Sequence, residues 1–102
     1  MLVAFSVAPS TTDDPDGSVS EAVAAAIRVV RESGISNRTD SMFTTLEGEW
    51  DECMDVIKRA CEAVQVASPR VSLVLKADIR PGYTGQLDAK VERVEARLAE
   101  SN

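Results

Sequence analysis

The sequence contains no histidine, which removes the side chain that proteins use most often as a general base and as a metal ligand. A serine or cysteine nucleophile would therefore have no histidine to take its proton. Cysteine is scarce, since only Cys53 and Cys61 occur. On one helix they would lie about 12 Å apart along the axis, too far for a disulfide bond. We interpret both as small buried hydrophobic residues, and we expect a protein that is not an enzyme and uses no cofactor.

Other scarcities exclude further classes of protein. No apolar run is long enough to cross a membrane. The 5 glycines are scattered and form no phosphate-binding loop. Acidic residues number 17 against 11 basic ones, and the net charge of −6 disfavours nucleic acid but tolerates a cationic small molecule. The apolar start, residues 1–5, is short and has no basic segment before it, so we interpret it as a strand and expect a cytoplasmic protein.

The residues that are present suffice for one domain over residues 1–102. Hydrophobic residues make up 44% and charged residues 27%, a balance typical of chains that fold. Because aromatic residues make up only 4%, the core must consist mainly of valine, isoleucine, leucine and alanine.

The first third of the chain predicts a strand and a helix. Residues 2–8 alternate in polarity, as a half-buried strand does, and one of its faces carries Val3, Phe5 and Val7. Ser18 and Glu21 fit a capping box, in which each side chain satisfies a free backbone N–H of the first helical turn. Gly34 is expected to end this helix.

Two short strands and a second helix are expected next. Residues 36–40 and 42–47 predict the strands, and the first has weak β propensity, as edge strands often do. Gly48 then breaks the pattern, and Pro69 follows the end of the helix. The apolar stripe of this helix is expected to comprise Trp50, Cys53, Met54, Ile57, Cys61 and Val64.

The last strand and a third helix complete the chain. Residues 70–80 alternate clearly, and one face carries Lys76, Asp78 and Arg80, which suit either a solvated or interfacial face or contact with a ligand. A turn at Pro81 leads to a charged helix with a narrow apolar stripe formed by Leu87, Val91, Val94 and Leu98.

This order predicts an α+β, ferredoxin-like βαββαβ fold with a four-stranded antiparallel sheet plus a C-terminal helix. Both long helices should cover one face of the sheet. The other face, with Leu2 and Val74 among small and polar neighbours, should then pack against another copy. We therefore expect a homodimer or homotetramer formed through sheet faces.

The junction at residues 42–50 is the segment most suggestive of a ligand site. Here a strand ends in Glu47 and Gly48, and an acidic, aromatic helix start follows. A carboxylate at this position could accept hydrogen bonds from an amine-bearing heterocycle, and Trp50 could contact a cation. The same pattern also suits an ordinary junction with surface acids and Trp50 in the core.

These residues resemble the small thiamine-binding protein family, also called the YkoF-like family, over nearly the whole chain. The most specific match is the junction at residues 42–52, MFTTLEGEWDE. Weaker matches are SVAP at 6–9, SVSE at 18–21, ESG at 32–34, RV at 70–71 and KAD at 76–78.

The resemblance implies a ferredoxin-like fold, packing through sheet faces, and binding of thiamine or its hydroxymethylpyrimidine moiety without turnover, as a carrier or sensor. It assigns the ligand to five positions, of which Glu47 would pair with the aminopyrimidine edge; they are Ser6, Ser20, Thr44, Glu47 and Trp50. This sequence departs from the family pattern at three other positions, with Ser41 for proline, Phe43 for glycine and Cys61 for histidine. Since Phe43 could fill the pocket, the alternative is a regulatory or scaffolding oligomer without a ligand.

Overall fold

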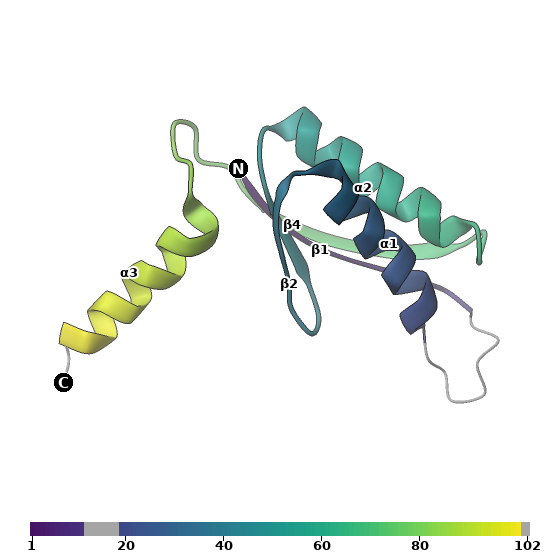
Figure 1. The fold of residues 1–102 in the computed structure, drawn as a ribbon, viewed down its shortest axis with the longest axis horizontal. Coiled ribbons are helices and arrows are strands. Elements are labelled where there is room, and N and C mark those ends of the chain that lie inside the picture. The colour runs from purple at the N-terminus through teal and green to yellow at the C-terminus, as the bar shows by residue number, and fades with distance from the viewer. Residues whose placement is uncertain (12–18, 101–102) are drawn as a thin grey trace.

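The computed structural model describes residues 1–11 and 19–100, and it confirms the predicted α+β fold. The strands and helices follow one another as β1, α1, β2, β3, α2, β4 and α3 (Figure 1). Their bounds are Leu2–Pro9 for β1, Ser20–Ser33 for α1, Ser36–Thr39 for β2, Thr44–Glu47 for β3, Trp50–Gln65 for α2, Val71–Asp78 for β4 and Gln86–Glu100 for α3.

The four strands form one antiparallel sheet in the order β2-β3-β1-β4. The predicted edge position of the weak strand β2 is therefore confirmed. β1 is central, and its Val3 lies opposite Leu46 of β3 and Ala77 of β4. Leu2 lies opposite Glu47 on one side and Asp78 on the other. This register brings two carboxylates to the same end of the sheet.

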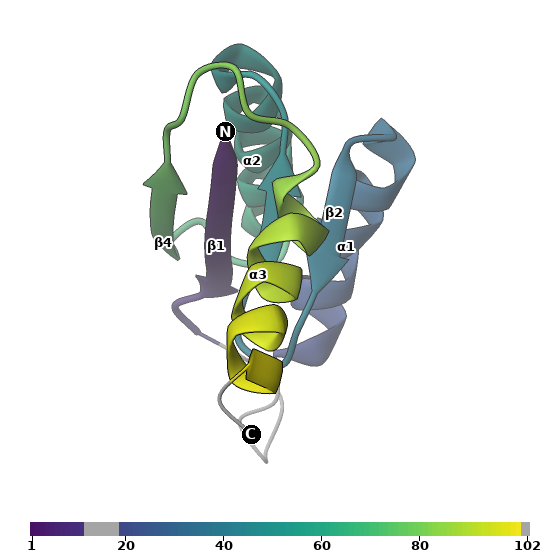
Figure 2. The ribbon, with the colours of Figure 1, turned by 90° about the vertical axis from the view of Figure 1, so that its left-hand side faces the viewer.

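The hydrophobic core lies between one face of the sheet and the helices α1 and α2, which lie together behind the sheet in Figure 2. The alternation predicted for β1 is confirmed, since Val3, Phe5 and Val7 are buried. As the composition requires, the rest of the core is aliphatic and small; it comprises Ala26, Val30, Ile35, Leu46, Cys53, Val56, Ile57, Ala60 and Val64.

The predictions about the two long helices had different outcomes. Gly34 has φ +78°, a left-handed conformation that favours glycine and ends α1 as predicted. Ser18, the predicted capping residue, lies outside the described residues, and α1 begins at Ser20. The prediction of Trp50 on the buried stripe of α2 is wrong, since its side chain is 54% exposed. Trp50 occupies the first turn, and the buried positions begin at Cys53.

The open face of the sheet, defined here as Leu2, Ala4, Ser6, Ala8 and Val74, lies opposite α1 and α2. Strand pleating places these side chains away from the buried set of β1, and the register sets Ser6 opposite Val74. Val74 is 55% exposed, and the other four are half-buried. In this structure no residue of α3 is buried, and Figure 1 shows that helix standing apart from the sheet.

Candidate functional site

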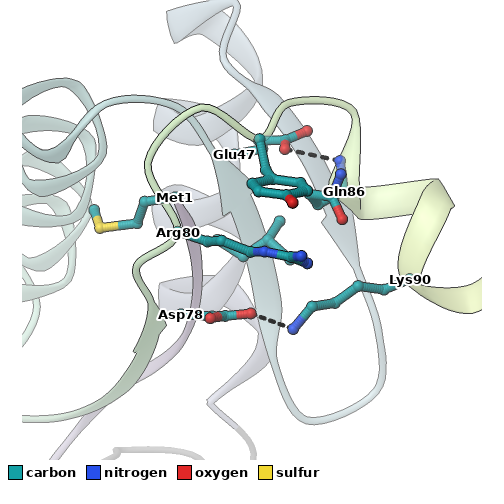
Figure 3. Close-up of a pocket in the computed structure, with 8 residues that line it drawn as sticks. Met1, Glu47, Asp78, Arg80, Gln86 and Lys90 are labelled. Atoms are coloured by element: carbon teal, nitrogen blue, oxygen red, sulfur yellow. Dashed lines mark hydrogen bonds and ion pairs between the residues drawn. The ribbon is translucent and has the colours of Figure 1, made fainter.

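A small pocket lies at the end of the sheet where β1 begins, β3 and β4 end, and α3 starts (Figure 3). Its cavity is about 10 Å³, room for about one water molecule. Charged and amide side chains form most of its wall, which comprises Met1, Leu2, Glu47, Asp78, Arg80, Tyr83, Gln86 and Lys90.

Glu47 ends β3 on the open-face side, because strand alternation turns Leu46 into the core. Its Oε2 accepts a hydrogen bond of 2.8 Å from the backbone N–H of Gln86, the first residue of α3. A carboxylate at a helix N-terminus satisfies a free N–H and interacts favourably with the helix dipole. Glu47 therefore joins the sheet to α3.

A second carboxylate in the wall, Asp78, forms an ion pair with Lys90 of α3. The hydrogen bond from the Lys90 ammonium lowers the pKa of the Asp78 carboxyl, and the nearby charges of Arg80 and Lys76 act in the same direction. Both side chains of the pair are more than two-fifths exposed, at 45% and 43%. Water therefore screens the pair, which holds α3 only weakly.

The loop between β4 and α3 closes the pocket with a cation stacked on an aromatic ring. The guanidinium carbon of Arg80 lies 3.4 Å from the ring centroid of Tyr83, within the range of a cation–π interaction. Gly82 and Gly85 flank this ring, both with left-handed φ angles of +82° and +68°. Because L side chains rarely adopt this backbone, the tight return of the loop depends on glycine at both positions.

The junction between β3 and α2 lies next to Glu47 and is held by hydrogen bonds to the first residue. The Met1 ammonium donates to the Gly48 carbonyl oxygen at 2.9 Å, and the Gly48 N–H donates to the Met1 carbonyl oxygen at 3.1 Å. A Cβ at Gly48 would collide with the Glu52 carboxylate and lie 3.3 Å from Ile35 Cδ1. The lack of a side chain at Gly48 thus leaves room for the Glu52 carboxylate to lie against this junction.

Of the five site residues that the sequence suggested, only Glu47 lines the pocket. Ser6 shares the open face but stands four residues along β1 from Leu2, about 13 Å away. Thr44 is buried on the opposite face of the sheet and donates a long hydrogen bond of 3.4 Å to Thr39. Ser20 and Trp50 are exposed at the starts of α1 and α2. The pocket does not bring these four together with Glu47.

The pocket also contains residues that the sequence did not single out. Asp78 and Arg80 were left open between a surface and a ligand role, but Tyr83, Gln86 and Lys90 carried no such signal. Their positions depend on how the loop after β4 turns α3 back toward β3, and periodicity does not report that direction. The one sequence feature that pointed to this region was the pair of charged residues Asp78 and Arg80 before a turn that contains glycines at 82 and 85.

Neither cysteine suggests a reactive site. Burial raises the pKa of the Cys53 thiol and of the half-buried Cys61 thiol, so both stay protonated and poorly nucleophilic near neutral pH. Among residues 1–11 and 19–100, no group of three or more metal-binding side chains lies close enough together to hold a metal ion. Over the same ranges, no helix is both long and apolar enough to cross a membrane.

Comparison with known proteins places the chain in a family. Residues 3–95 match the family described as thiamine-binding protein. The UPF0045 protein Mb1933 of Mycobacterium bovis is 52% identical over 99 residues, which cover 96% of this chain and 94% of that protein. The chain therefore belongs to the thiamine-binding protein family, as the junction at residues 42–52 indicated.

Solved structures share the fold. A domain of unknown function, DUF77, from Bacillus cereus is 37% identical, with a TM-score of 0.77 over 88% of this chain and 85% of that one. A Thermotoga maritima protein, named as a candidate for thiamine biosynthesis or salvage, is 26% identical, with a TM-score of 0.73 over 89% and 96% of the two chains.

Proposed function

We propose that this protein binds thiamine or its hydroxymethylpyrimidine moiety without turning it over, as a carrier or sensor in the cytoplasm. The observation that carries the proposal is the Glu47 carboxylate in the wall of a pocket, in a chain that belongs to the thiamine-binding protein family. An aminopyrimidine presents N–H donors along one edge, and a carboxylate accepts such bonds strongly. The thiazolium of thiamine is a cation, which suits the Tyr83 ring and the Asp78 carboxylate.

The pocket must enlarge before it can hold such a ligand, because its cavity of about 10 Å³ takes no more than a water molecule. The contacts that close it are weak ones. α3 has no buried residue, the Lys90–Asp78 pair is screened by water, and the loop contains two left-handed glycines. Outward movement of α3 and of the Arg80–Tyr83 stack would open the space beside Glu47.

The absence of turnover is supported by the chemistry of the wall. Serine, threonine, cysteine and histidine are all missing from the residues that line the pocket in the described chain. The Lys90 ammonium is paired with Asp78, and the Met1 ammonium donates to the Gly48 carbonyl oxygen. The wall therefore lacks the serine, threonine or cysteine nucleophile with a histidine base that covalent catalysis most often uses.

The deciding experiment is isothermal titration with thiamine and with hydroxymethylpyrimidine, on the wild type and on Glu47→Gln. Glutamine keeps a side-chain oxygen that can accept the Gln86 N–H, so α3 stays capped while the charge is lost. We expect saturable heat for the wild type and at least a tenfold loss of affinity in the variant, since a charge-assisted hydrogen bond contributes about 1.5–3 kcal/mol.

The matched control is Glu32→Gln, which removes the same charge from an exposed position at the end of α1. Its affinity should equal that of the wild type. A folded wild type that gives no heat with either ligand would refute the proposal, and equal binding by wild type and Glu47→Gln would remove Glu47 from the site. Alanine variants of Ser6, Ser20, Thr44 and Trp50 test the other predicted positions in the same titration.

For assembly, we propose a homodimer or homotetramer formed through the open face of the sheet. Val74 exposes more than half of its surface there, beside small side chains that allow close approach of a second sheet. This same observation favours the second candidate function, a regulatory or scaffolding oligomer that binds no ligand.

A further inference from the structure

We propose that the pocket prefers a phosphorylated form of its ligand, with Arg80 and Lys90 holding the phosphate. This inference rests on the proposed function, because it concerns the same pocket. The wall combines two carboxylates, Glu47 and Asp78, with two cationic side chains, Arg80 and Lys90. The chain as a whole has a net charge of −6, so the pocket is a locally balanced region on an acidic protein.

Arg80 is the cation best placed to take an anion. The ion pairs between described residues join Arg38 to Asp88, Arg59 to Asp55 and Lys90 to Asp78, and none of these three includes Arg80. Its flat face lies on Tyr83, which leaves the N–H edge of the guanidinium as a donor. Figure 3 shows Arg80 between Glu47 and the Asp78–Lys90 pair, pointing toward α3. A guanidinium fixed in this way suits two-pronged binding of a phosphate.

Lys90 can supply the second contact, because its present partner is weakly held. Its ion pair with Asp78 is exposed on both sides, and such pairs contribute little. A phosphate carries up to two negative charges and three acceptor oxygens, so it competes well with one carboxylate for the ammonium. The same movement of α3 that opens the pocket would also separate Lys90 from Asp78.

The balance of charge favours a ligand that itself carries both signs. The thiazolium is the one charged group of thiamine, so thiamine leaves Arg80 without an anionic partner next to the bound positive charge. Thiamine monophosphate combines the thiazolium cation with an anion, so each sign meets its opposite in the wall. Hydroxymethylpyrimidine phosphate has no thiazolium cation, and it would meet the wall through an aminopyrimidine edge at Glu47 and a phosphate at the two cations.

The test is titration of the wild type, Arg80→Gln, Arg80→Lys and Arg28→Gln with thiamine and with thiamine monophosphate at low ionic strength. Arg28→Gln is the matched control, since it removes one positive charge from an exposed position on α1. We expect the wild type and Arg28→Gln to bind the monophosphate about tenfold more tightly than thiamine. Arg80→Gln should lose this preference, and Arg80→Lys should regain part of it.

The same titration with hydroxymethylpyrimidine and its phosphate distinguishes the two phosphorylated ligands. The pocket takes the compound whose phosphorylated form the wild type prefers and for which Arg80→Gln loses that preference. Equal affinities for phosphorylated and unphosphorylated ligands would overturn the inference and leave the proposed function standing. A uniform loss for both in Arg80→Gln would also overturn it and assign Arg80 a structural role. Absence of any binding by the folded wild type would refute the proposed function itself.

Discussion

Under the proposed function, the Glu47 carboxylate accepts hydrogen bonds from two sources. In the structure its Oε2 accepts the Gln86 N–H at the start of α3, and in the proposed complex it accepts N–H donors of a pyrimidine. A carboxylate has two oxygens and about four lone-pair sites, so Glu47 has acceptor sites beyond the one that Gln86 uses. Binding at Glu47 would then be felt directly by the first turn of α3.

The two cysteines differ in exposure, and this difference sets their reactivity. Burial raises the pKa of each thiol above its ordinary value of 9.0, so less thiolate is present at neutral pH than in an exposed cysteine. With a thiol reagent such as Ellman's reagent, we expect slow modification near pH 7 that accelerates as the pH approaches 9, with half-buried Cys61 reacting before fully buried Cys53.

Absorbance at fixed pH measures these rates. Cys61→Ser should abolish the faster phase, and Cys53→Ala, the control, should retain it. Two phases of equal rate in the wild type at pH 7 would show that Cys53 is no better protected than Cys61.

At the scale of elements, α3 is the least firmly attached helix. Polar contacts attach its first half to the sheet, where Glu47 accepts from Gln86, Asp88 pairs with Arg38, and Lys90 pairs with Asp78. The apolar stripe predicted for it forms no core contact, and Val91, Val94 and Leu98 are all more than half exposed. The attachment of α3 to the sheet therefore depends on contacts that salt and acid can weaken.

The Asp78–Lys90 pair gives a pH dependence whose sign is fixed. Because Lys90 lowers the pKa of Asp78 in the folded state, the pair stabilises the docked α3 above the ordinary carboxyl pKa of 3.8. That contribution is lost as the pH falls through the lowered value. We expect the Asp78 carboxyl carbon, followed by NMR, to titrate with a midpoint below 3.8, and Lys90→Ala to move the midpoint upward.

Lys58→Ala is the control for this titration, because Lys58 is an exposed cation on α2 and should leave the Asp78 midpoint unchanged. A wild-type midpoint at or above that of Lys90→Ala would mean that the ion pair does not persist in solution.

Much of the fold could be predicted because local patterns dictate it. The alternation in β1 separates Val3, Phe5 and Val7 from the open face, and Gly34 supplies a conformation that other residues avoid. The prediction for Trp50 was wrong because the residue, although large and apolar, lies in the first turn of α2, before the buried positions begin at Cys53. Small Ala60, not Trp50, packs fully into the core.

In the candidate site, the sequence singled out Glu47 and left Asp78 and Arg80 open between a surface role and a ligand role. The other walls of the pocket come from β4, the loop and α3, and Gln86 is separated from Glu47 by 39 residues. A periodic pattern does not predict the direction in which the chain leaves a turn. The contact between these segments could therefore be seen only in the structure. Thr44 is a different case. Strand alternation already placed its side chain on the opposite face from Glu47, whereas the resemblance to the family assigned both residues to the ligand.

At the scale of the whole molecule, one covered and one open sheet face predict self-association. Sedimentation equilibrium should give twice or four times the 11.0 kDa of one chain for the wild type at micromolar concentration. Val74→Lys introduces a charge into the open face and should shift the mass to one chain, because burying an unpaired charge at an interface is costly.

Val66→Lys is the matched control, since Val66 is 89% exposed at the end of α2, away from the open face. Its mass should equal that of the wild type. A wild type that sediments as a single chain would remove both the assembly proposal and the scaffolding alternative.

The place of β4 at the edge of the sheet has a practical consequence for storage of the purified protein. β4 has a neighbouring strand, β1, on one side only, and its segment Val71–Leu75 contains no charged residue. Long apolar edge strands are the usual starting points of cross-β aggregation. The charges that interrupt this strand, at Lys76 and Asp78, therefore act as gatekeepers, and buffers that neutralise Asp78 should promote fibrils.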